Sequence, residues 1–293
     1  MSSLRQSAKM LLRKSPPLFR LTANVIAPVN RGQRIKAAGR TIAYDVRTRA
    51  LGKPTTARIG RKSKIVSYQG ETNSPHAVYR NPPNTPEMYV WRNHLRAGDT
   101  FMDVGTNVGI YTLFAIDCGA RVIGVEPDPA SQKRLRENLA LNGYAAEIHD
   151  VALSTEPGTM RLTQGLDSNN HLVIDGSGEG VEVEVRTLDS VLGDRHIAGL
   201  KIDVEGAERL VIEGARQALT EHRIDLIQME WSDVRSRELL GEVRGVTSDI
   251  LADAGYVFYR PDKTGRLHKI VGDVIPGRDI FAAPADLPID HLT

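Results

Sequence analysis

Short apolar runs alternate with helix-like segments along the chain from Glu87 onward, and glycine or proline bounds most of them. Apolar runs of this length predict buried strands, whereas apolar residues that recur every three or four positions predict helices. Strands that alternate with helices are typical of a mostly parallel sheet with helices on both faces. We therefore predict seven strands, at residues 100–104, 121–126, 146–153, 199–204, 224–231, 256–260 and 279–283.

The segments between these strands predict four helices and one insertion. The helices cover residues 109–118, 127–143, 207–219 and about 235–254. Residues 156–186 instead predict an inserted hairpin, because two strand-like runs flank a polar loop. Sheets of this kind bind ligands beyond the C-terminal ends of their strands, so we expect functional side chains there.

Residues 1–86 have a different pattern and a different charge. Residues 1–70 contain 16 Lys and Arg residues and one acidic residue, Asp45, whereas the whole chain has a net charge of only +2. Halves this different usually have different roles, so we predict a basic N-terminal extension over 1–86 and a separate domain over 87–293. Within the extension, residues 40–46 and 64–69 predict short strands, and residues 71–87, with four prolines, predict a loop.

The start of the extension predicts an amphipathic helix. Its apolar positions are Leu4, Ala8, Leu11 and Leu12, and its neighbouring basic stripe is Arg5, Lys9 and Arg13. One interpretation is that the extension covers the acidic domain as a cap. The other is that the helix binds an anionic membrane surface or a lipid-linked acidic acceptor. No segment has the roughly 20 apolar residues of a membrane span, and we expect a cytoplasmic protein, either free or peripheral to a membrane.

The sequence DVGTNVG at residues 103–109 joins the first predicted strand to a helix. Gly105 and Gly109 are four residues apart, so neither the dinucleotide spacing G-x-G-x-x-G nor the lysine of a P-loop is present. Glu126 ends the next strand, where a carboxylate can accept hydrogen bonds from a ribose diol. Asp103 adds a negative charge that suits a cationic ligand. The pattern favours S-adenosylmethionine, which has a ribose and a sulfonium cation, over a nicotinamide cofactor.

Further segments carry a resemblance to a known family. LKIDVEGAERLVIEGARQAL at residues 200–219, together with FMDVGTNVGIYTLFA, GVEPDP and IQMEW, resembles the FkbM-type S-adenosylmethionine-dependent methyltransferases over about residues 87–283. The resemblance implies a Rossmann-like class I methyltransferase fold with a mostly parallel seven-stranded sheet. It also implies transfer of a methyl group to a hydroxyl of a sugar, glycolipid or other natural product.

The same resemblance implies the residues that bind the cofactor. Asp103, Gly105, Asn107 and Gly109 are expected at its methionine end, Glu126 at the ribose, and Asp150 and Val151 near the adenine. Thr106 stands where members of the family commonly have alanine.

Three carboxylates are candidates for the chemistry. While the chain KIDVE is extended, Asp203 and Glu205 share one face with Lys201, and Glu230 ends the neighbouring predicted strand. Such carboxylates can bind Mg²⁺ through oxygen ligands, or one of them can act as a general base with a raised pKa. Glu208 lies in the first turn of the next helix, where favouring the helix dipole is a sufficient role.

His171 is the alternative base, because it lies on the inserted hairpin, which is placed to cover an acceptor. Two other functions stay open beside O-methylation. A non-catalytic scaffold would bind S-adenosylmethionine without needing the carboxylates. A nucleic-acid methyltransferase would use the basic extension, but Asn81-Pro82-Pro83-Asn84 lacks the aromatic residue of the motif that acts on base amino groups, so nucleic acid is disfavoured.

Overall fold

The computed structural model describes residues 21–22, 24–25, 32, 34–69, 71, 74–164, 170–173, 180–231, 240, 245–271, 279–289 and 291–292. The amphipathic helix predicted at residues 4–13 lies outside these residues, as does part of the helix predicted at 235–254. Among the described residues, no helix combines the length and the apolar character that crossing a membrane requires.

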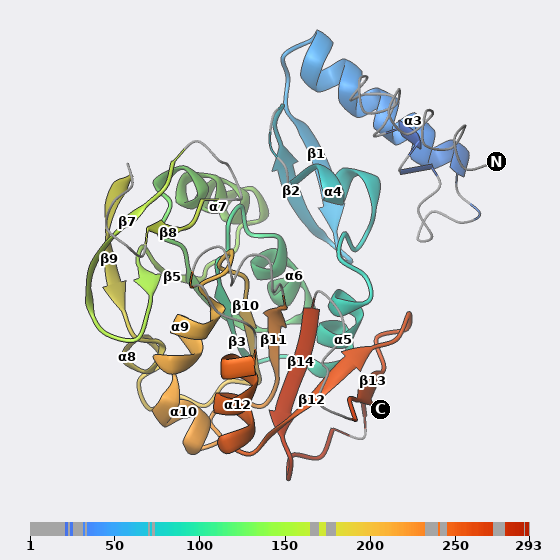
Figure 1. Cartoon of the computed structure of the whole chain (residues 1–293). Coiled ribbons are helices and arrows are strands. Elements are labelled where there is room, and N and C mark those ends of the chain that lie inside the picture. The colour runs from blue at the N-terminus through green and yellow to red at the C-terminus, as the bar shows by residue number, and fades with distance from the viewer. Residues whose placement is uncertain are drawn as a thin grey trace, which may run out of the picture.

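A mixed sheet forms the centre of the described chain (Figure 1). Its strand order is β13-β12-β14-β11-β10-β3-β4-β5. The strands are β3 (Thr100–Val104), β4 (Arg121–Val125), β5 (Glu147–His149), β10 (Gly199–Ile202), β11 (Ile227–Glu230), β12 (Tyr256–Pro261), β13 (Leu267–Lys269) and β14 (Asp279–Pro284). The five strands from β11 to β5 run parallel, and β14 is antiparallel to both of its neighbours. The predicted Rossmann-like α/β sheet is confirmed, with β13 as one strand more than the seven expected.

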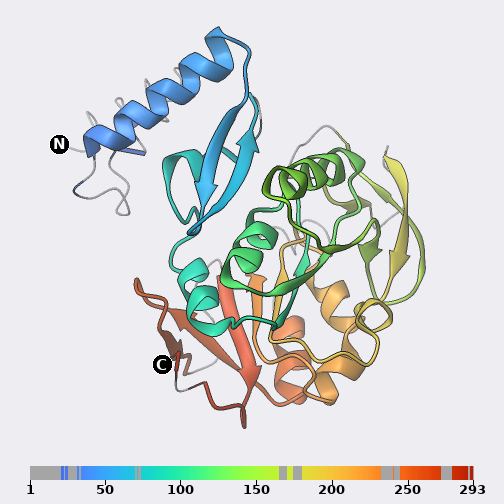
Figure 2. The ribbon, with the colours of Figure 1, turned by 180° about the vertical axis from the view of Figure 1, so that it is seen from behind.

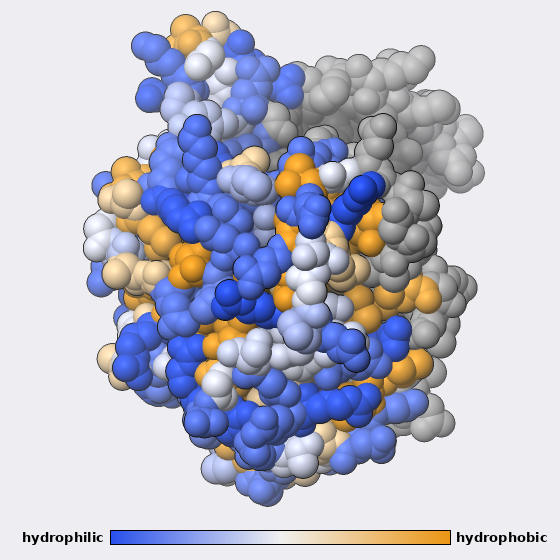
Figure 3. All heavy atoms as spheres, turned by 90° about the vertical axis from the view of Figure 1, so that its left-hand side faces the viewer, coloured by the Kyte–Doolittle hydropathy of each residue, from blue (hydrophilic) through white to orange (hydrophobic). Residues whose placement is uncertain are grey.

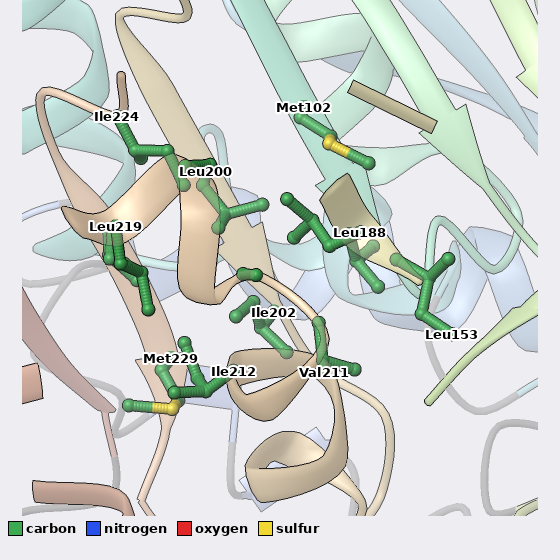
Figure 4. Packing of buried hydrophobic residues seen from close by; sticks show 14 of the residues in the cluster. Met102, Leu153, Leu188, Leu200, Ile202, Val211, Ile212, Leu219, Ile224 and Met229 are labelled. Atoms are coloured by element: carbon green, nitrogen blue, oxygen red, sulfur yellow. The ribbon is translucent and has the colours of Figure 1, made fainter. Parts of the chain in front are cut away.

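Helices cover both faces of this sheet. On one face lie α8 (Leu188–Leu192), α9 (Glu208–Glu213), α10 (Arg216–Thr220) and α12 (Gly245–Asp253), and on the other α5 (Glu87–His94), α6 (Ile110–Cys118) and α7 (Pro129–Asn142). Figure 4 shows the first face, where Val211 and Ile212 of α9 pack against Ile202 and Met229 of the sheet. The central strands β3 and β10 are therefore almost wholly buried, with helices packed on both of their faces.

Two predicted elements are each divided into two. Residues 207–219 form α9 and α10 instead of one helix. α9 ends at its C-cap residue Gly214, where a Cβ would be 2.3 Å from the carbonyl oxygen of Ser154. Residues 146–153 form β5 in the main sheet and β6 (Ala152–Leu153) in a second sheet.

The inserted segment forms this second sheet, of order β6-β9-β7-β8. Its further strands are β7 (Gly158–Leu162), β8 (Leu172–Val173) and β9 (Val181–Arg186). β7 and β9 are antiparallel, as expected for the predicted hairpin. Figure 3 views the molecule from the side of this sheet, and hydrophilic residues cover most of that side, with apolar residues gathered in smaller patches.

The N-terminal part differs most from the prediction. It consists of α3 (Arg34–Asp45), the π-helical turn η2 (Val46–Ala50), the hairpin of β1 (Thr55–Ile59) and β2 (Ser63–Ser67), and α4 (Ser74–Tyr79). Residues 40–46 are therefore helical and not a strand, because Ala37, Thr41 and Tyr44 recur at helical spacing and bury one side. Residues 74–79 form a helix inside the predicted loop, and the prolines that follow it make cis peptide bonds at Asn81-Pro82 and Thr85-Pro86.

The β1-β2 hairpin is hydrogen-bonded to α6, one of the helices that cover the large sheet. The Asp117 carboxylate of α6 accepts the backbone N–H groups of Arg61, Lys62 and Ser63 at 2.6–2.9 Å. α3 lies on the far side of the hairpin and projects away from the large sheet in both views (Figures 1 and 2). The division of the chain at residue 86 stays a prediction.

Candidate active site

A pocket lies at the C-terminal ends of β3, β4 and β10, and the inserted sheet forms its other wall. It holds about 700 Å³ of empty space, part of it open to solvent. The residues that line it are Val104, Gly105, Asn107, Val125, Glu126, Pro127, Asp128, Ser131, Val151, Ala152, Leu153, Leu162, Asn170, His171, Leu172, Asp203, Val204 and Glu205. This pocket therefore lies where a parallel sheet of this kind binds ligands.

Glu126 places a buried carboxylate in this pocket. Its two oxygens accept the backbone N–H groups of Asn107 at 2.7 Å and of Asp128 at 3.0 Å. Burial raises the pKa of Glu126 to about 7, although these two hydrogen bonds oppose the shift. Because a carboxylate has about four acceptor positions, two remain for a ligand, which fits the hydroxyls of a ribose.

The loops after β3 and β10 touch through their backbones. Gly105 has a φ of +80°, and a Cβ at this position would lie 2.0 Å from the carbonyl oxygen of Asp203. Only glycine allows both this conformation and this approach. Gly109, with a φ of +94°, is the N-cap residue of α6, where a Cβ would meet Leu135 at 2.6 Å. Gly105 lines the pocket, whereas Gly109 does not.

Asp103 lies below the pocket and does not line it. Its carboxylate is fully buried, accepts a hydrogen bond from the Thr112 hydroxyl at 2.7 Å, and lies 3.8 Å from Nζ of Lys201. Lys201 Nζ also lies 3.2 Å from Asp203 and 4.7 Å from the ring centre of Tyr111. Burial lowers the pKa of Lys201, but Asp203 and Asp103 reverse this, so the pKa lies above its usual value and the ammonium stays charged.

The two residues expected near the adenine lie in different surroundings. Val151 is buried and lines the pocket. The Asp150 side chain is nearly half exposed, and both of its oxygens lie 2.7 Å from Nη2 of Arg136 on α7. Val151 and Leu153 therefore offer apolar contact to a flat ring system, whereas Asp150 pairs with Arg136 and does not line the pocket.

The structure places the three candidate carboxylates around the end of β10. The strand ends at Ile202, so the alternation expected from KIDVE does not continue to Glu205, whose φ is +56°. Asp203 and Glu205 line the pocket. Glu230 ends the neighbouring β11, outside the pocket lining, and its pKa is raised to about 8 by burial first and then by the charges of Asp203, Glu208 and Glu205.

Glu208 holds the loop that carries the first two carboxylates. It is buried, and its carboxylate accepts the backbone N–H groups of Val204 at 3.1 Å and Gly206 at 3.2 Å. Burial raises its pKa to about 7. Its position in the first turn of α9 agrees with the helix-terminal role expected from the sequence.

His171 reaches the pocket from the inserted sheet. Its backbone N–H donates to Oγ1 of Thr163 at 2.9 Å, and its carbonyl accepts the Thr163 N–H at 3.0 Å, so the chain next to β8 is fixed against β7. The side chain lines the pocket together with Asn170 and Leu172.

A metal ion has no ready ligand set in the part of the chain that the structure describes. No group of three or more His, Cys, Asp or Glu side chains is arranged there to hold one. Asp203, Glu205 and Glu230 are close enough to influence one another electrostatically, but they do not form such a group.

Several pocket residues were not predicted from the sequence. Asp128 is the N-cap of α7, with its side chain accepting the Ser131 N–H at 2.8 Å, and both residues line the pocket. The helix-start pattern Asp-Pro in GVEPDP was a usable signal for Asp128. Leu162 and Asn170 come from the insertion, and no local pattern shows which of its residues turn toward the large sheet.

Comparisons with known proteins show the family of this chain. A model of the methyltransferase FkbM domain matches residues 103–258. The chain is 31% identical over 189 residues to the 31-O-demethyl-FK506 methyltransferase FkbM of Streptomyces tacrolimicus, which covers 52% of this chain and 68% of that protein. It is 28% identical over 160 residues to methyltransferase sdnD of Sordaria araneosa, covering 41% of this chain but only 62%, less than two thirds, of the relative.

Among solved structures, a methyltransferase from Pyrococcus furiosus is similar over 85% of this chain and 98% of that chain, with 13% identity and a TM-score of 0.39. The fold itself is established by the strand order of this chain. Since the family model matches more than half of the residues, the protein belongs to the FkbM methyltransferase family and is a methyltransferase.

Proposed function

We propose that the protein is an S-adenosylmethionine-dependent O-methyltransferase that acts on a hydroxyl of a saccharide, glycolipid or other secondary metabolite. The observation that carries this proposal is that three carboxylates lie at the ends of β10 and β11, next to the pocket that contains Glu126. Asp203 and Glu205 line this pocket, and their charges help to raise the pKa of Glu230. Binding the cofactor needs Glu126 but not the other three. Their presence at the edge of the pocket is accounted for by an acceptor that must lose a proton.

The pocket fits the cofactor in its donor and acceptor chemistry. Glu126 offers acceptor positions for the ribose hydroxyls, and Val151 and Leu153 offer an apolar wall for the adenine. When bound, S-adenosylmethionine supplies a methyl group activated by a sulfonium cation. Gly105 allows the loops after β3 and β10 to touch beneath the pocket.

The acceptor hydroxyl needs orientation and a base. Alignment of the reacting groups is worth about 7–11 kcal/mol, and a general base typically adds 10²–10⁴-fold. Glu230 is our choice for the base, because a pKa of about 8 makes it a stronger proton acceptor than an ordinary carboxylate. It takes the hydroxyl proton as the acceptor oxygen takes the methyl group. Asp203 and Glu205 raise the pKa of Glu230, and Asp203 is placed to orient the acceptor.

Two alternatives for this step stay open to test. His171 faces the same pocket from the inserted sheet and would be the base if the acceptor enters from that side. Mg²⁺ held by Asp203, Glu205 and Glu230 would instead acidify the hydroxyl directly. We favour the base over the metal because the described side chains do not form a group of metal ligands.

The name of the Streptomyces relative describes methylation at an oxygen, which supports an oxygen acceptor here as well. A scaffold without turnover would bind S-adenosylhomocysteine equally well but transfer no methyl group to any acceptor.

The test is methyl transfer to hydroxyl-bearing acceptors in fractionated cell extract, followed by mass spectrometry of the products. Once an acceptor is found, kcat/KM should rise with pH with a midpoint near pH 8, and Glu230→Gln should lower it at least about a hundredfold. Asp203→Asn should abolish transfer while leaving S-adenosylhomocysteine affinity nearly unchanged. Glu182→Gln, an exposed carboxylate of β9, is the matched control and should behave as wild type.

Three results would separate the versions of the proposal. Loss of activity on chelation, restored by Mg²⁺, would replace the base by the metal. Full activity of both Asp203→Asn and Glu230→Gln would reject the carboxylates and leave His171. Methylation of nitrogen or carbon but not oxygen would reject O-methylation while keeping the cofactor site.

A further inference from the structure

One edge of β2 has a helix beside it instead of a strand. In the described part of the chain, β1 and β2 form a sheet of two strands, and α7 runs along the other edge of β2 (Figures 1 and 2). An open strand edge presents backbone N–H and C=O groups that need other partners. Side chains of α7 supply these partners.

Three side chains of α7 bond to alternate residues of β2. Nη2 of Arg134 donates to the carbonyl of Val66 at 2.9 Å, and Oδ1 of Asn138 accepts the Val66 N–H at 2.9 Å. Oδ1 of Asn142 accepts the Lys64 N–H at 2.7 Å, and its Nδ2 donates to the Lys64 carbonyl at 2.6 Å. Four residues along a helix advance about 6 Å and two residues along a strand about 6.6 Å, so the two elements keep step.

Asn138 makes a second contact that its neighbour Asn142 does not make. It is fully buried, and its Nδ2 donates to the carbonyl of Val108 at 2.8 Å. The further bond of the Asn142 amide goes to the carbonyl of Asn138, within α7 itself. A backbone N–H only donates and a carbonyl only accepts, so the contacts with Val66 and Val108 fix which end of the Asn138 amide carries the oxygen.

Val108 belongs to the loop of residues 103–109, which we call the cofactor loop. Its N–H donates to Oδ1 of Asn107 at 2.7 Å, and the Asn107 N–H donates to Glu126 at 2.7 Å. Asn107 and Glu126 line the pocket. Asn107 has a φ of +50°, which is uncommon for a residue with a side chain and persists only where surrounding contacts hold it.

We propose that Asn138 is a positioning residue through which the β1-β2 hairpin holds the cofactor loop in the shape that binds S-adenosylmethionine. The Val66 N–H orients the Asn138 amide, and that amide fixes the carbonyl of Val108 next to Asn107. The hairpin is thereby part of the cofactor site, although it does not line the pocket. This inference rests on the proposed cofactor pocket, but not on the acceptor or the base.

The test is the affinity for S-adenosylhomocysteine, measured by calorimetry on the full-length protein. Asn138→Leu should weaken binding about threefold to tenfold, the effect of losing one hydrogen bond that supports the site. Asn142→Leu is the matched control and should change the affinity by less than about twofold. The control removes two bonds between α7 and β2, whereas Asn138→Leu removes one, so mere fastening of the hairpin predicts the opposite order.

A second variant tests the donor to Val108 separately. In Asn138→Asp the carboxylate still accepts the Val66 N–H but has no proton for the Val108 carbonyl, so binding at pH 8 should be weaker than in the wild type. Protonation of this buried carboxyl restores the donor. The ratio of the variant's affinity to that of the wild type, both measured at the same pH, should therefore move toward one as pH falls to 6.

Hydrogen exchange of the wild-type protein decides the question if these variants do not fold. Coupling between two sites is reciprocal, so S-adenosylhomocysteine should slow exchange of the Val66 N–H. The Lys64 N–H, on the same strand but bonded to Asn142, should be slowed less. Nuclear magnetic resonance resolves the two amides.

Two outcomes would overturn the proposal alone. One is an equal effect of Asn138→Leu and Asn142→Leu on affinity while both proteins are folded. The other is an exchange rate of the Val66 N–H that S-adenosylhomocysteine leaves unchanged. Failure of the wild-type protein to bind S-adenosylhomocysteine would overturn the cofactor pocket together with this inference, whereas normal binding without methyl transfer would reject only the proposed reaction.

Discussion

Protonation of Glu126 should couple cofactor binding to pH. In the free protein, burial raises the pKa of this carboxyl to about 7 against an ordinary value of 4.5. Two ribose hydroxyls donating to the carboxylate would favour its charged form and lower the pKa again. Binding of S-adenosylhomocysteine must therefore release a proton whenever the free protein holds one at this site.

The size of the effect follows from the pKa of the free protein. If the pKa falls from about 7 to about 4.5 on binding, the affinity for S-adenosylhomocysteine at pH 6 should be about tenfold weaker than at pH 8. Close to one proton should be released per bound ligand near pH 6, and almost none above about pH 8. The direction is fixed by the sign of the shift, because a raised acid pKa means that the free site prefers the proton.

Isothermal titration calorimetry in two buffers with different ionisation enthalpies measures both the affinity and the released protons. Glu126→Gln should bind more weakly, by about 1.5–3 kcal/mol for the loss of hydrogen bonds to a charged acceptor, and should show no pH dependence. Asp150→Asn is the comparison variant, since that exposed side chain pairs with Arg136, and it should keep the wild-type pH dependence. An affinity of the wild-type protein that is constant from pH 6 to pH 8 would refute the reasoning.

The same group affects the stability of the free protein. Because its folded pKa lies above its unfolded pKa, the stabilisation is fully present below about pH 4.5 and is lost as pH rises to about 7. Glu208 contributes in the same direction and over the same range. S-adenosylhomocysteine should therefore raise the melting temperature more at pH 8 than at pH 6.

Two further predictions concern the support beneath the pocket. Gly105→Ala should lower the free energy of unfolding by about 2–5 kcal/mol, because alanine is strained at this φ and its Cβ would collide with the backbone of Asp203. Gly143→Ala, at a φ of +64° with nothing within 4 Å, should lower it by only about 1–2 kcal/mol. Equal losses in urea unfolding would contradict this reasoning. Lys201→Met should lower the free energy of unfolding by about 3–5 kcal/mol, because it leaves the buried Asp103 carboxylate without its cation. Adding Asp103→Asn should recover part of that loss. An unchanged melting temperature of Lys201→Met would show that the ion pair is not needed for stability.

The positions of the large sheet's strands along the sequence were predictable because each central strand is buried on both faces. The runs at 100–104 and 199–204 each contain three large apolar side chains, and glycines end the helices that follow. The N-terminal part was not predictable in this way. The alternation in RTIAYDV suggested a strand, but packing of Thr41 and Tyr44 on the hairpin outweighed the β-propensity of the threonine and the isoleucine.

The candidate site was predictable only where residues stand at the end of a strand. Glu126 and Asp203 follow apolar runs, so their place at the pocket could be inferred from the fold class. The outer wall of the pocket could not be inferred from the sequence. Leu162 and His171 reach this wall through the pairing of β7 with β8, which no local pattern encodes. Asp103 illustrates the opposite case, since a strand-end acidic residue belongs to the layer below the pocket.

The motifs DVG (residues 103–105) and KIDV (residues 201–204) lie side by side in the sheet and form one structural unit. In the register of β3 with β10, Asp103 lies directly opposite Lys201, and both side chains are buried. Two residues further along each strand, Gly105 meets the backbone of Asp203. The same register therefore sets the buried ion pair and the contact between the two loops that carry the pocket. From single segments of the sequence, Asp103, Lys201 and Gly105 have separate roles. In the folded sheet, the pairing of β3 with β10 places all three, and through them it fixes the position of Asp203 at the pocket.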